Sequence, residues 1–214
     1  MTPSPAAWAW ALTGALAVAL AWLLPWGVQQ GWWSSSLPER WAWQQATAFS
    51  EPGRWFTAGL VHLSPQHLVG NSWAALVVVM LGLAANVPWR SVLGWWLAWP
   101  LCQALLPLDA GATAVVGGLS GPLHAGAVLV AWHVARHHPP ASRWVGWALL
   151  AGVALKLGTE ALAGPQPLSA HDDQAQQVSQ WVSQASHRVA VGTALLLAWA
   201  LDGIMGVSPF RRPP

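Results

Sequence analysis

The feature that most constrains this chain is its scarcity of charge: no charged side chain precedes Glu39, and 7% of the 214 residues are charged. A soluble domain usually has about 25% charged residues, so this chain cannot cover a water-exposed surface. Disorder is also excluded, because a chain with 55% hydrophobic residues buries its apolar surface. The sequence therefore predicts a polytopic, all-α membrane protein. Its single cysteine, Cys102, excludes an intramolecular disulfide and a cysteine-based metal cluster.

Six apolar runs have lengths close to the ~20 residues that a helix needs to cross the hydrocarbon core. They are residues 7–28, 68–87, 92–108, 119–135, 144–163 and 187–207. The first run resembles a signal peptide, but it has no basic segment before it and is longer than the usual apolar segment, so we expect a retained helix. The chain shows no internal repeat and no separate soluble domain. We expect one six-helix membrane domain over residues 1–214.

The charges of the loops predict the orientation of this domain. With six spans, both termini lie on one side. The loops of that side carry basic residues without acidic ones, at Arg90, Arg136, Arg143, Arg211 and Arg212. The opposite loops carry both signs, at Glu39, Arg40, Glu51, Arg54, Asp109, Asp172, Asp173 and Arg188. Because an excess of Lys and Arg marks the cytoplasmic face, we expect cytoplasmic termini and even-numbered spans that begin at the outer face.

Polar side chains gather at the outer starts of the three even-numbered spans. The second span opens with His62, His67 and Asn71, the fourth with Ser120, and the sixth with His187. Ionisable and hydrogen-bonding groups are costly at membrane depth, and they usually face the bundle interior and serve a function. Three segments far apart in sequence therefore bring a serine, histidines and an amide to one depth near the outer face.

Ser120 is the candidate nucleophile. A single serine in a span is commonly only a small packing residue. Here its neighbours favour more than packing: Gly118 and Gly121 leave room for another backbone, and the Gly117–Gly118 pair permits a sharp turn before the helix. A serine at a helix N-terminus also lies beside free N–H groups, which favour an oxyanion.

His67 and Asn71 are spaced i, i+4 and so project from one helical face. They are either a polar pair that binds a neighbouring helix or two donors directed at developing negative charge. His62 precedes them in a loop, where we expect a structural hydrogen bond to the backbone. A zinc site built from His62, His67 and His187 is a third interpretation, which the absence of an H-E-x-x-H motif and of a nearby carboxylate disfavours.

His187 is the candidate general base, because a serine hydroxyl is a poor nucleophile unless it is deprotonated during attack. His124 competes for this role, since it lies one turn after Ser120 on the same face. An i+4 histidine has to bend back towards the N-terminus to reach the hydroxyl. We therefore favour His187 as the base and expect His124 to pack against it or orient it.

This pattern resembles the rhomboid family of intramembrane serine proteases. The resemblance runs from about Glu51 to the sixth span. Its motifs are H-x-x-x-x-H-x-x-x-N at His62, His67 and Asn71, G-x-S-G at Gly118, Ser120 and Gly121, the later His187, and the upstream Glu51, Arg54 and Thr57. Two positions depart from the family pattern. Rhomboids usually carry glycines three and seven residues after the histidine, where this chain has Ala190 and Ala194. They also often carry an aromatic residue at the position of His124, stacked on the catalytic histidine.

The resemblance implies a Ser–His dyad without a cofactor or a metal. Ser120 attacks the peptide carbonyl, His187 takes the proton, and the oxyanion is held by His67, Asn71 and the backbone N–H of Ser120.

The segment Gly-Leu-Ser-Gly-Pro-Leu-His is most similar to the rhombosortase branch, as are Lys156 and Glu160 in the fifth span. The branch implies a bacterial inner-membrane enzyme with its site towards the periplasm. Its partners are the lipid bilayer and transmembrane substrates, namely exported proteins that end in a Gly-Gly-type sorting tail, and no nucleic acid is involved. Lys156 and Glu160 are also spaced i, i+4, so mutual neutralisation explains them equally well.

Three other functions compete with this hypothesis. A general rhomboid protease would cut other transmembrane substrates. A non-proteolytic rhomboid-like binding protein would have lost the serine, the histidine or the oxyanion residues, and none is missing here. A transporter or channel would need polar groups along a path through the bilayer, whereas these concentrate at one depth. Asp202 lies too far along the sixth span to join the dyad, and we expect it at the cytoplasmic interface.

Overall fold

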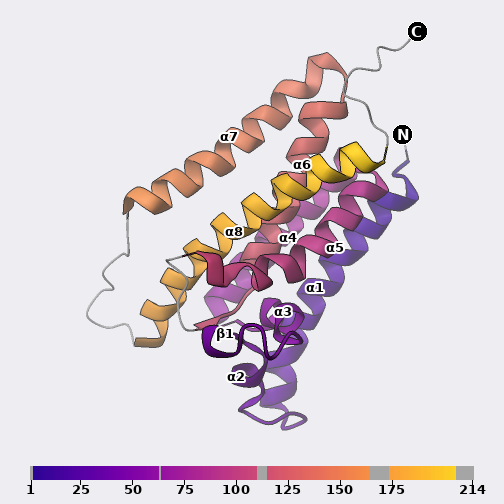
Figure 1. Cartoon of the computed structure of the whole chain (residues 1–214). Helices are drawn as coiled ribbons and strands as arrows, with labels where there is room; N and C mark the ends of the chain where they lie inside the picture. Colours follow the sequence, from indigo (N-terminus) through magenta and orange to yellow (C-terminus); the bar gives the residue numbers. More distant parts are fainter. Residues whose placement is uncertain (1, 63, 110–114, 164–173, 206–214) are drawn as a thin grey trace.

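The structure is a computed structural model that describes residues 2–62, 64–109, 115–163 and 174–205, with side chains of the last segment described from Gln184 onward. Its six long helices are α1 (Pro5–Gln29), α4 (Pro65–Ala84), α5 (Trp89–Ala104), α6 (Ser120–His137), α7 (Pro140–Ala163) and α8 (Gln174–Ile204) (Figure 1). The predicted all-α class is confirmed.

Short elements fill the connection between α1 and α4 and the segments beside α5. They are α2 (Leu37–Trp41), β1 (Trp43–Gln44), η1 (Gln45–Thr47), α3 (Arg54–Thr57), η2 (Ala58–Leu60), η3 (Leu106–Leu108) and β2 (Val115–Val116). β1 and β2 form an antiparallel pair in which Trp43 faces Val116. This pair ties the first long loop to the segment that precedes α6.

Side-chain caps mark the starts of α1 and α4. Ser4 and Ser64 each cap a helix through their hydroxyl oxygen and are each followed by proline, which tolerates the first turn. The predicted start of the second span at residue 68 was therefore late, because the cap lies before Pro65. The third span was predicted to reach residue 108, but α5 ends at Ala104 and a 3-10 turn follows, where Pro107 disfavours helical geometry in the residue before it. The sixth span was predicted from residue 187, yet α8 begins at Gln174, because a polar segment continues the helix beyond its apolar part.

Successive long helices run in opposite directions. At one end of the molecule, the N–H of Ser4 donates to Asn86 Oδ1 over 2.8 Å, which joins the start of α1 to the turn between α4 and α5. At the same end, Asp202 near the end of α8 binds Arg90 over 3.0 Å and His137 over 2.8 Å. One end of the molecule therefore contains the start of α1, the turn between α4 and α5, the turn between α6 and α7, and the end of α8. The starts of α4 and α6 lie at the other end (Figure 1).

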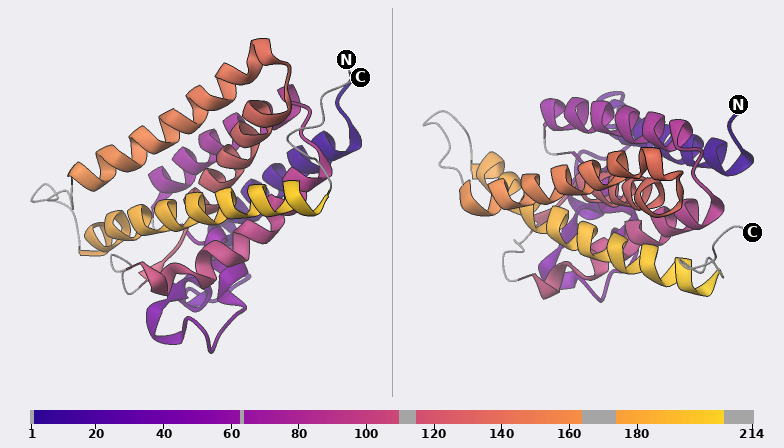
Figure 2. Two further views of the ribbon diagram at one scale, coloured as in Figure 1. Left: turned by 45° about the horizontal axis from the view of Figure 1, so that its top comes forward. Right: turned by 90° about the horizontal axis from the view of Figure 1, so that it is seen from above.

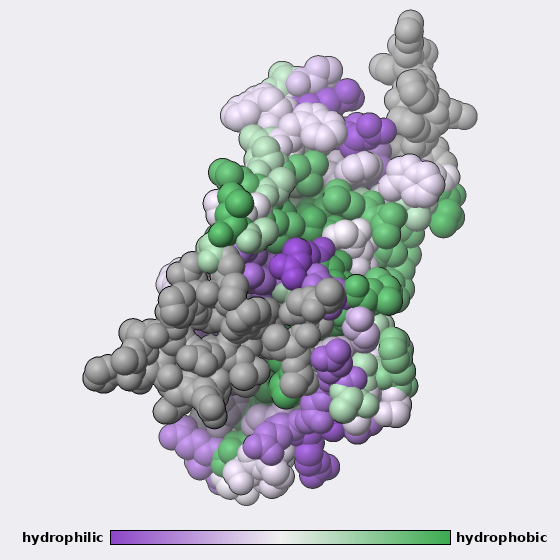
Figure 3. Space-filling view, turned by 60° about the vertical axis from the view of Figure 1, so that its left-hand side comes forward, coloured by the Kyte–Doolittle hydropathy of each residue, from purple (hydrophilic) through white to green (hydrophobic). Residues whose placement is uncertain are grey.

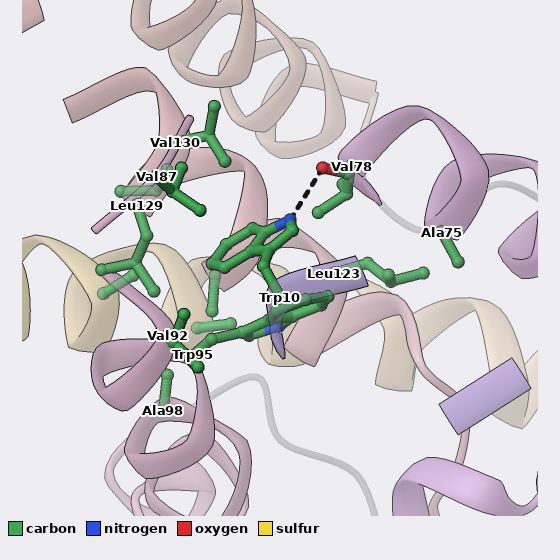
Figure 4. Close-up of a cluster of buried hydrophobic side chains, with 14 of the residues drawn as sticks. Trp10, Ala75, Val78, Val87, Val92, Trp95, Ala98, Leu123, Leu129 and Val130 are labelled. Atoms are coloured by element: carbon green, nitrogen blue, oxygen red, sulfur yellow. Dashed lines mark hydrogen bonds between the residues drawn. The ribbon is translucent and has the colours of Figure 1, made fainter. Parts of the chain in front are cut away.

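Helix α6 is the centre of the bundle, and the largest buried cluster surrounds it. Trp10 of α1 and Trp95 of α5 pack with ring centroids 4.1 Å apart. The indole N–H of Trp10 donates to the backbone carbonyl of Val78 over 3.1 Å (Figure 4), and that of Trp95 donates to the carbonyl of Pro122 over 2.8 Å. Buried indoles need such partners, so these two bonds fix α1 and α5 against α4 and α6.

Helix α7 lies at the outside of the bundle (Figure 2). The structure describes it completely, and Gly146 is its only buried residue. A Cβ atom at this position would overlap the backbone of α6 at Ala131 and Ala135. The glycine thus permits the close contact that holds α7 to α6.

Four helical segments among the described residues are long and apolar enough to cross a membrane: Pro5–Gln29, Pro65–Ala84, Pro140–Ala163 and Gln184–Ile204. They present large apolar side chains outward, and Leu12, Leu16 and Leu20 along one face of α1 are 60, 60 and 48% exposed. Figure 3 shows hydrophobic side chains across the middle of one face, around one hydrophilic patch, and more hydrophilic side chains at both ends. These are the features of a membrane protein.

Helices α5 and α6 were also predicted as spans, and they fall outside this set of four. α5 has 16 residues, and the 18 residues of α6 include His124, His133, Arg136 and His137. α5 is therefore shorter than a typical membrane-spanning helix, and α6 is less hydrophobic than one.

Candidate active site

A tight turn delivers Ser120 to the first position of α6. Gly118 adopts φ +111°, a conformation that favours glycine, and its N–H donates to the carbonyl of Ala58 over 2.9 Å. The preceding Gly117 lies so close to Val61 that a Cβ atom would approach its carbonyl oxygen to 2.8 Å. The two glycines therefore press the turn against the segment that leads into α4.

This turn also contacts His67 and Asn71. A Cβ atom at Gly118 would lie 2.5 Å from Cε1 of His67 and 3.3 Å from Nδ2 of Asn71. Both side chains come from the first two turns of α4, and the Ser64 cap accepts the backbone N–H of His67 over 3.1 Å. The structure thus brings His67 and Asn71 close to Gly118, two residues before Ser120.

His62 lies in the loop before α4 and orients Asn71. Its Nδ1–H donates to the carbonyl of Leu60 over 3.2 Å, and its Nε2 accepts from Nδ2 of Asn71 over 3.0 Å. Burial, and secondarily the neighbouring His67, lowers the pKa of His62 from 6.5 to about 4. The ring is therefore neutral at pH 7. One amide N–H of Asn71 is used by this bond, which leaves the second N–H for another acceptor.

Helix α8 reaches the Ser120 turn through two contacts. The rings of His124 and His187 stack with centroids 3.9 Å apart and planes at 26°. A Cβ atom at Gly121 would lie 3.5 Å from the carbonyl oxygen of Ser186. His187 is 4% exposed, so its ring is enclosed beside the first turn of α6.

His124 binds the backbone of Ser120 and not its hydroxyl. The Nδ1–H group of His124 donates to the carbonyl oxygen of Ser120 over 2.7 Å, one turn back along α6. With this nitrogen engaged and its face on His187, His124 has the geometry of an orienting partner. It occupies the place at which the resemblance expected an aromatic ring stacked on the base.

Ala190 and Ala194 lie on α8 below His187, and both are completely buried in the main core cluster. They stand where rhomboids usually have glycine. Small residues at i, i+4 let neighbouring helices approach closely. The alanines therefore keep α8 close to the bundle core, and so keep His187 at the turn.

Glu160 of α7 contacts His187, which the sequence had not indicated. Nδ1 of His187 lies 3.1 Å from each of the two carboxylate oxygens of Glu160. Lys156, one turn before Glu160, forms an ion pair with the same carboxylate, and its Nζ lies 3.4 Å from Nδ1 of His187. The i, i+4 spacing of these two ionisable residues in an apolar span is fully explained by a local ion pair, so no sequence pattern indicated the contact with His187.

The upstream residues Glu51, Arg54 and Thr57 brace the first loop through the following hydrogen bonds. Arg54 binds Glu51 over 2.6 Å and donates to the carbonyl of Ala42 over 3.1 Å. The hydroxyl of Thr57 donates to the carbonyl of Trp41 over 2.8 Å. These bonds hold α3 beside the strand pair, and η2 then supplies the Ala58 carbonyl that receives Gly118.

Within the described ranges, no group of three or more His, Cys, Asp or Glu side chains is arranged to hold a metal ion. Asp202 lies at the opposite end of the bundle, where Trp132 also donates to it over 2.8 Å. It belongs to a separate polar cluster with Arg90 and His137. The loop acids Asp172 and Asp173, and Arg211 and Arg212, lie outside the described residues.

No protein-family model, no curated protein and no solved structure matches this chain.

Proposed function

We propose that this protein is an intramembrane serine endopeptidase of the rhomboid type. One observation carries the proposal: three segments far apart in sequence converge on the turn that presents Ser120. They are the loop at His62 with the start of α4 at His67 and Asn71, the first turn of α6 with His124, and α8 at His187. Such a combination of hydroxyl, imidazole and amide groups at a helix N-terminus suits acyl transfer.

The chemistry follows from the groups present. Ser120 Oγ attacks the carbonyl carbon of the scissile peptide, and its proton passes to Nε2 of His187. The resulting oxyanion accepts hydrogen bonds from His67, from the second N–H of Asn71 and from the backbone N–H of Ser120. The C–N bond then breaks, His187 returns the proton to the leaving amine, and water or an external amine resolves the acyl-enzyme.

The bilayer location is part of the same proposal. In it, α5 and α6 also cross the membrane, and α5 has large apolar side chains such as Trp96 and Leu97 exposed on its surface. This gives six spans and places both termini on the arginine-rich side. The lateral surface of α6 is largely buried by its neighbours, and this accounts for a polar helix at membrane depth. The positive-inside rule assigns the termini to the cytoplasm of a bacterial inner membrane and the Ser120 turn to the outer face.

The substrates that fit the proposal are exported proteins with a C-terminal sorting tail, as in the rhombosortase branch. Such a tail consists of a Gly-Gly-type motif, a transmembrane helix and a basic cluster. Its helix can lie beside the apolar surface of the enzyme, while the small residues before it present an accessible backbone to Ser120. Cleavage of other transmembrane proteins but not of these tails would reassign the enzyme to general rhomboid proteolysis.

The experiment uses the full chain in lipid vesicles with a fluorophosphonate probe and a tail-bearing substrate. Ser120→Ala removes one oxygen from a position where a small residue fits, so we expect unchanged thermal stability with loss of both labelling and cleavage. His187→Ala should lose cleavage nearly as fully, and Asn71→Ala should lose very roughly 100-fold, because other oxyanion donors remain.

The matched control is Ser72→Ala, which removes a hydroxyl from the same end of α4. That hydroxyl only donates to the Leu68 carbonyl and accepts from Trp22, so the variant should label like the wild type. Equal activity in Ser120→Ala would reject the serine mechanism. Binding of tail helices without any cleavage or labelling would identify a non-proteolytic binding protein, and inactivation by chelators would revive the zinc interpretation.

A further inference from the structure

Helix α7 contacts the Nδ1 edge of the His187 ring through Glu160. Nδ1 lies 3.1 Å from both Oε1 and Oε2 of Glu160, so the carboxylate straddles the ring nitrogen. The Glu160 side chain is 20% exposed and that of His187 is 6% exposed. This is a largely enclosed carboxylate–imidazole contact between two helices, and it joins residues 27 positions apart.

The identity of the Nδ1 partner decides which nitrogen of His187 is the base. A carboxylate accepts, so it binds the tautomer that carries hydrogen on Nδ1 and leaves the lone pair of Nε2 for a hydroxyl proton. An ammonium donates, so contact with Lys156 would favour hydrogen on Nε2, and this tautomer cannot accept the proton. Nδ1 is closer to the carboxylate oxygens, at 3.1 Å, than to Nζ of Lys156, at 3.4 Å.

Lys156 is itself explained by its bond to Glu160. The two side chains form an ion pair one helical turn apart, and the lysine side chain is 46% exposed while the carboxylate is mostly covered. A lysine in this place keeps the carboxylate ionised beside apolar surroundings and remains solvated. Lys156 therefore lies near His187 because it is the counter-charge of Glu160, which contacts His187.

We propose that Glu160 is a positioning residue for the peptidase reaction, in which its carboxylate holds His187 in the tautomer and orientation that activate Ser120. This inference rests on the proposed function and extends the expected Ser–His dyad to a Ser–His–Glu arrangement. During attack, the proton of Ser120 moves to Nε2, and Glu160 stabilises the imidazolium that forms without taking up a proton itself. The third group comes from α7, which otherwise has little contact with α8.

Other charged or titratable groups also act on His187. His124 of α6 stacks on it, His67 of α4 and the adjacent Arg188 interact with it electrostatically, and Arg188 is bound to Asp109 over 2.9 and 3.0 Å. His124, His67 and Arg188 are not carboxylates, and the carboxylate of Asp109 is bound to Arg188. Glu160 is the group whose carboxylate lies at Nδ1 of His187.

The test compares initial rates of fluorophosphonate labelling and of tail cleavage in lipid vesicles. Glu160→Gln keeps the shape but can donate an amide hydrogen to Nδ1, so we expect kcat and the labelling rate to fall about 10²–10⁴-fold with KM and thermal stability little changed. Glu160→Asp keeps the carboxylate one methylene further away and should recover at least about tenfold over Glu160→Gln.

Two variants of the same helical turn serve as controls. Lys156→Gln removes the ion pair and keeps the carboxylate, so its rate should fall by less than about tenfold. Thr159→Val removes an exposed hydroxyl that donates only to the Lys156 carbonyl, and its rate should equal that of the wild type. A merely structural ion pair predicts equal losses in Lys156→Gln and Glu160→Gln, and that result would overturn the proposal.

The wild-type reaction separates the two proposals. If Ser120 of the wild type is labelled and Glu160→Gln reacts within threefold of it, the positioning role is wrong and the peptidase proposal stands. If the wild type is neither labelled nor able to cleave the tail, both proposals are rejected. A large loss in Glu160→Gln that Glu160→Asp does not relieve, together with a lowered melting temperature in both, would also reject positioning in favour of a structural role.

Discussion

Substitution of Gly118 by alanine probes the contact on which the whole candidate site depends. At φ +111°, an L-residue is strained, and such conformations cost of order 1–3 kcal/mol. The new Cβ atom would also lie 2.5 Å from Cε1 of His67, whereas ordinary contacts begin at 3.4 Å, so His67 or the turn must move by 3.4 − 2.5 = 0.9 Å. Overpacking of this kind typically costs a further 1–3 kcal/mol. We therefore expect Gly118→Ala to lower the free energy of unfolding by at least about 2 kcal/mol.

The same displacement should be visible in the chemistry. A misplacement of about 1 Å between reacting groups can cost roughly 100-fold in rate. Gly118→Ala should therefore reduce fluorophosphonate labelling of Ser120 by about this factor, even under conditions where the variant is fully folded. Labelling is measured on the full chain in vesicles.

Gly70→Ala is the matched control, because Gly70 lies on α4 directly before Asn71. No atom lies within 4 Å of a Cβ atom there, and the position is exposed. The alanine should stabilise α4 by about 0.5–1 kcal/mol through its better helix propensity and leave labelling unchanged. Unfolding is followed in mixed micelles by the fluorescence of the 19 tryptophans. If Gly118→Ala proves as stable and as reactive as Gly70→Ala, the turn is not held against His67 and Asn71.

Two further predictions concern stability. Gly146→Ala brings a Cβ atom into contact with the backbone of α6 and should lower the free energy of unfolding by about 1–3 kcal/mol. Gly152→Ala, in open space on the same helix, should raise it by up to about 1 kcal/mol. Equal unfolding midpoints of the two variants in mixed micelles would contradict the packing of α7 against α6. His62 has a pKa of about 4 in the folded chain and 6.5 as its ordinary value, so the unfolded chain binds more protons between these pH values and stability falls as the pH drops through them. The loss amounts to at most about 3 kcal/mol at 1.36 kcal/mol for each pKa unit, and unfolding measured at pH 7 and pH 4 should show a smaller loss in His62→Gln than in the wild type.

Much of the architecture was accessible from the sequence, because helix formation in an apolar chain is governed by local length and composition. All six apolar runs correspond to long helices, and the errors fall at their ends. The late start predicted for α8 shows the reason: hydropathy marks only the apolar part of a helix, while the polar residues from Gln174 onward continue the same backbone hydrogen-bond pattern. The start of α4 lies three residues before the predicted one, because the Ser64 cap and Pro65 begin the helix ahead of its apolar run.

The sequence by itself determined that Ser120 stands at the start of α6 and that His67 and Asn71 lie in the first turns of α4, since spacing and turn residues fix these places locally. His187 was expected at the start of the sixth span, but it lies well inside α8, which begins at Gln174. Only the tertiary structure decided that His124 stacks on His187 and that Glu160 reaches it. The i, i+4 pair of Lys156 and Glu160 has a complete local explanation, so no pattern along the chain shows that the carboxylate also turns towards α8. That contact depends on the distance between the packed helices and on their rotation about their own axes. Small residues such as Gly146 determine the distance, because they let the backbones of α7 and α6 come into contact.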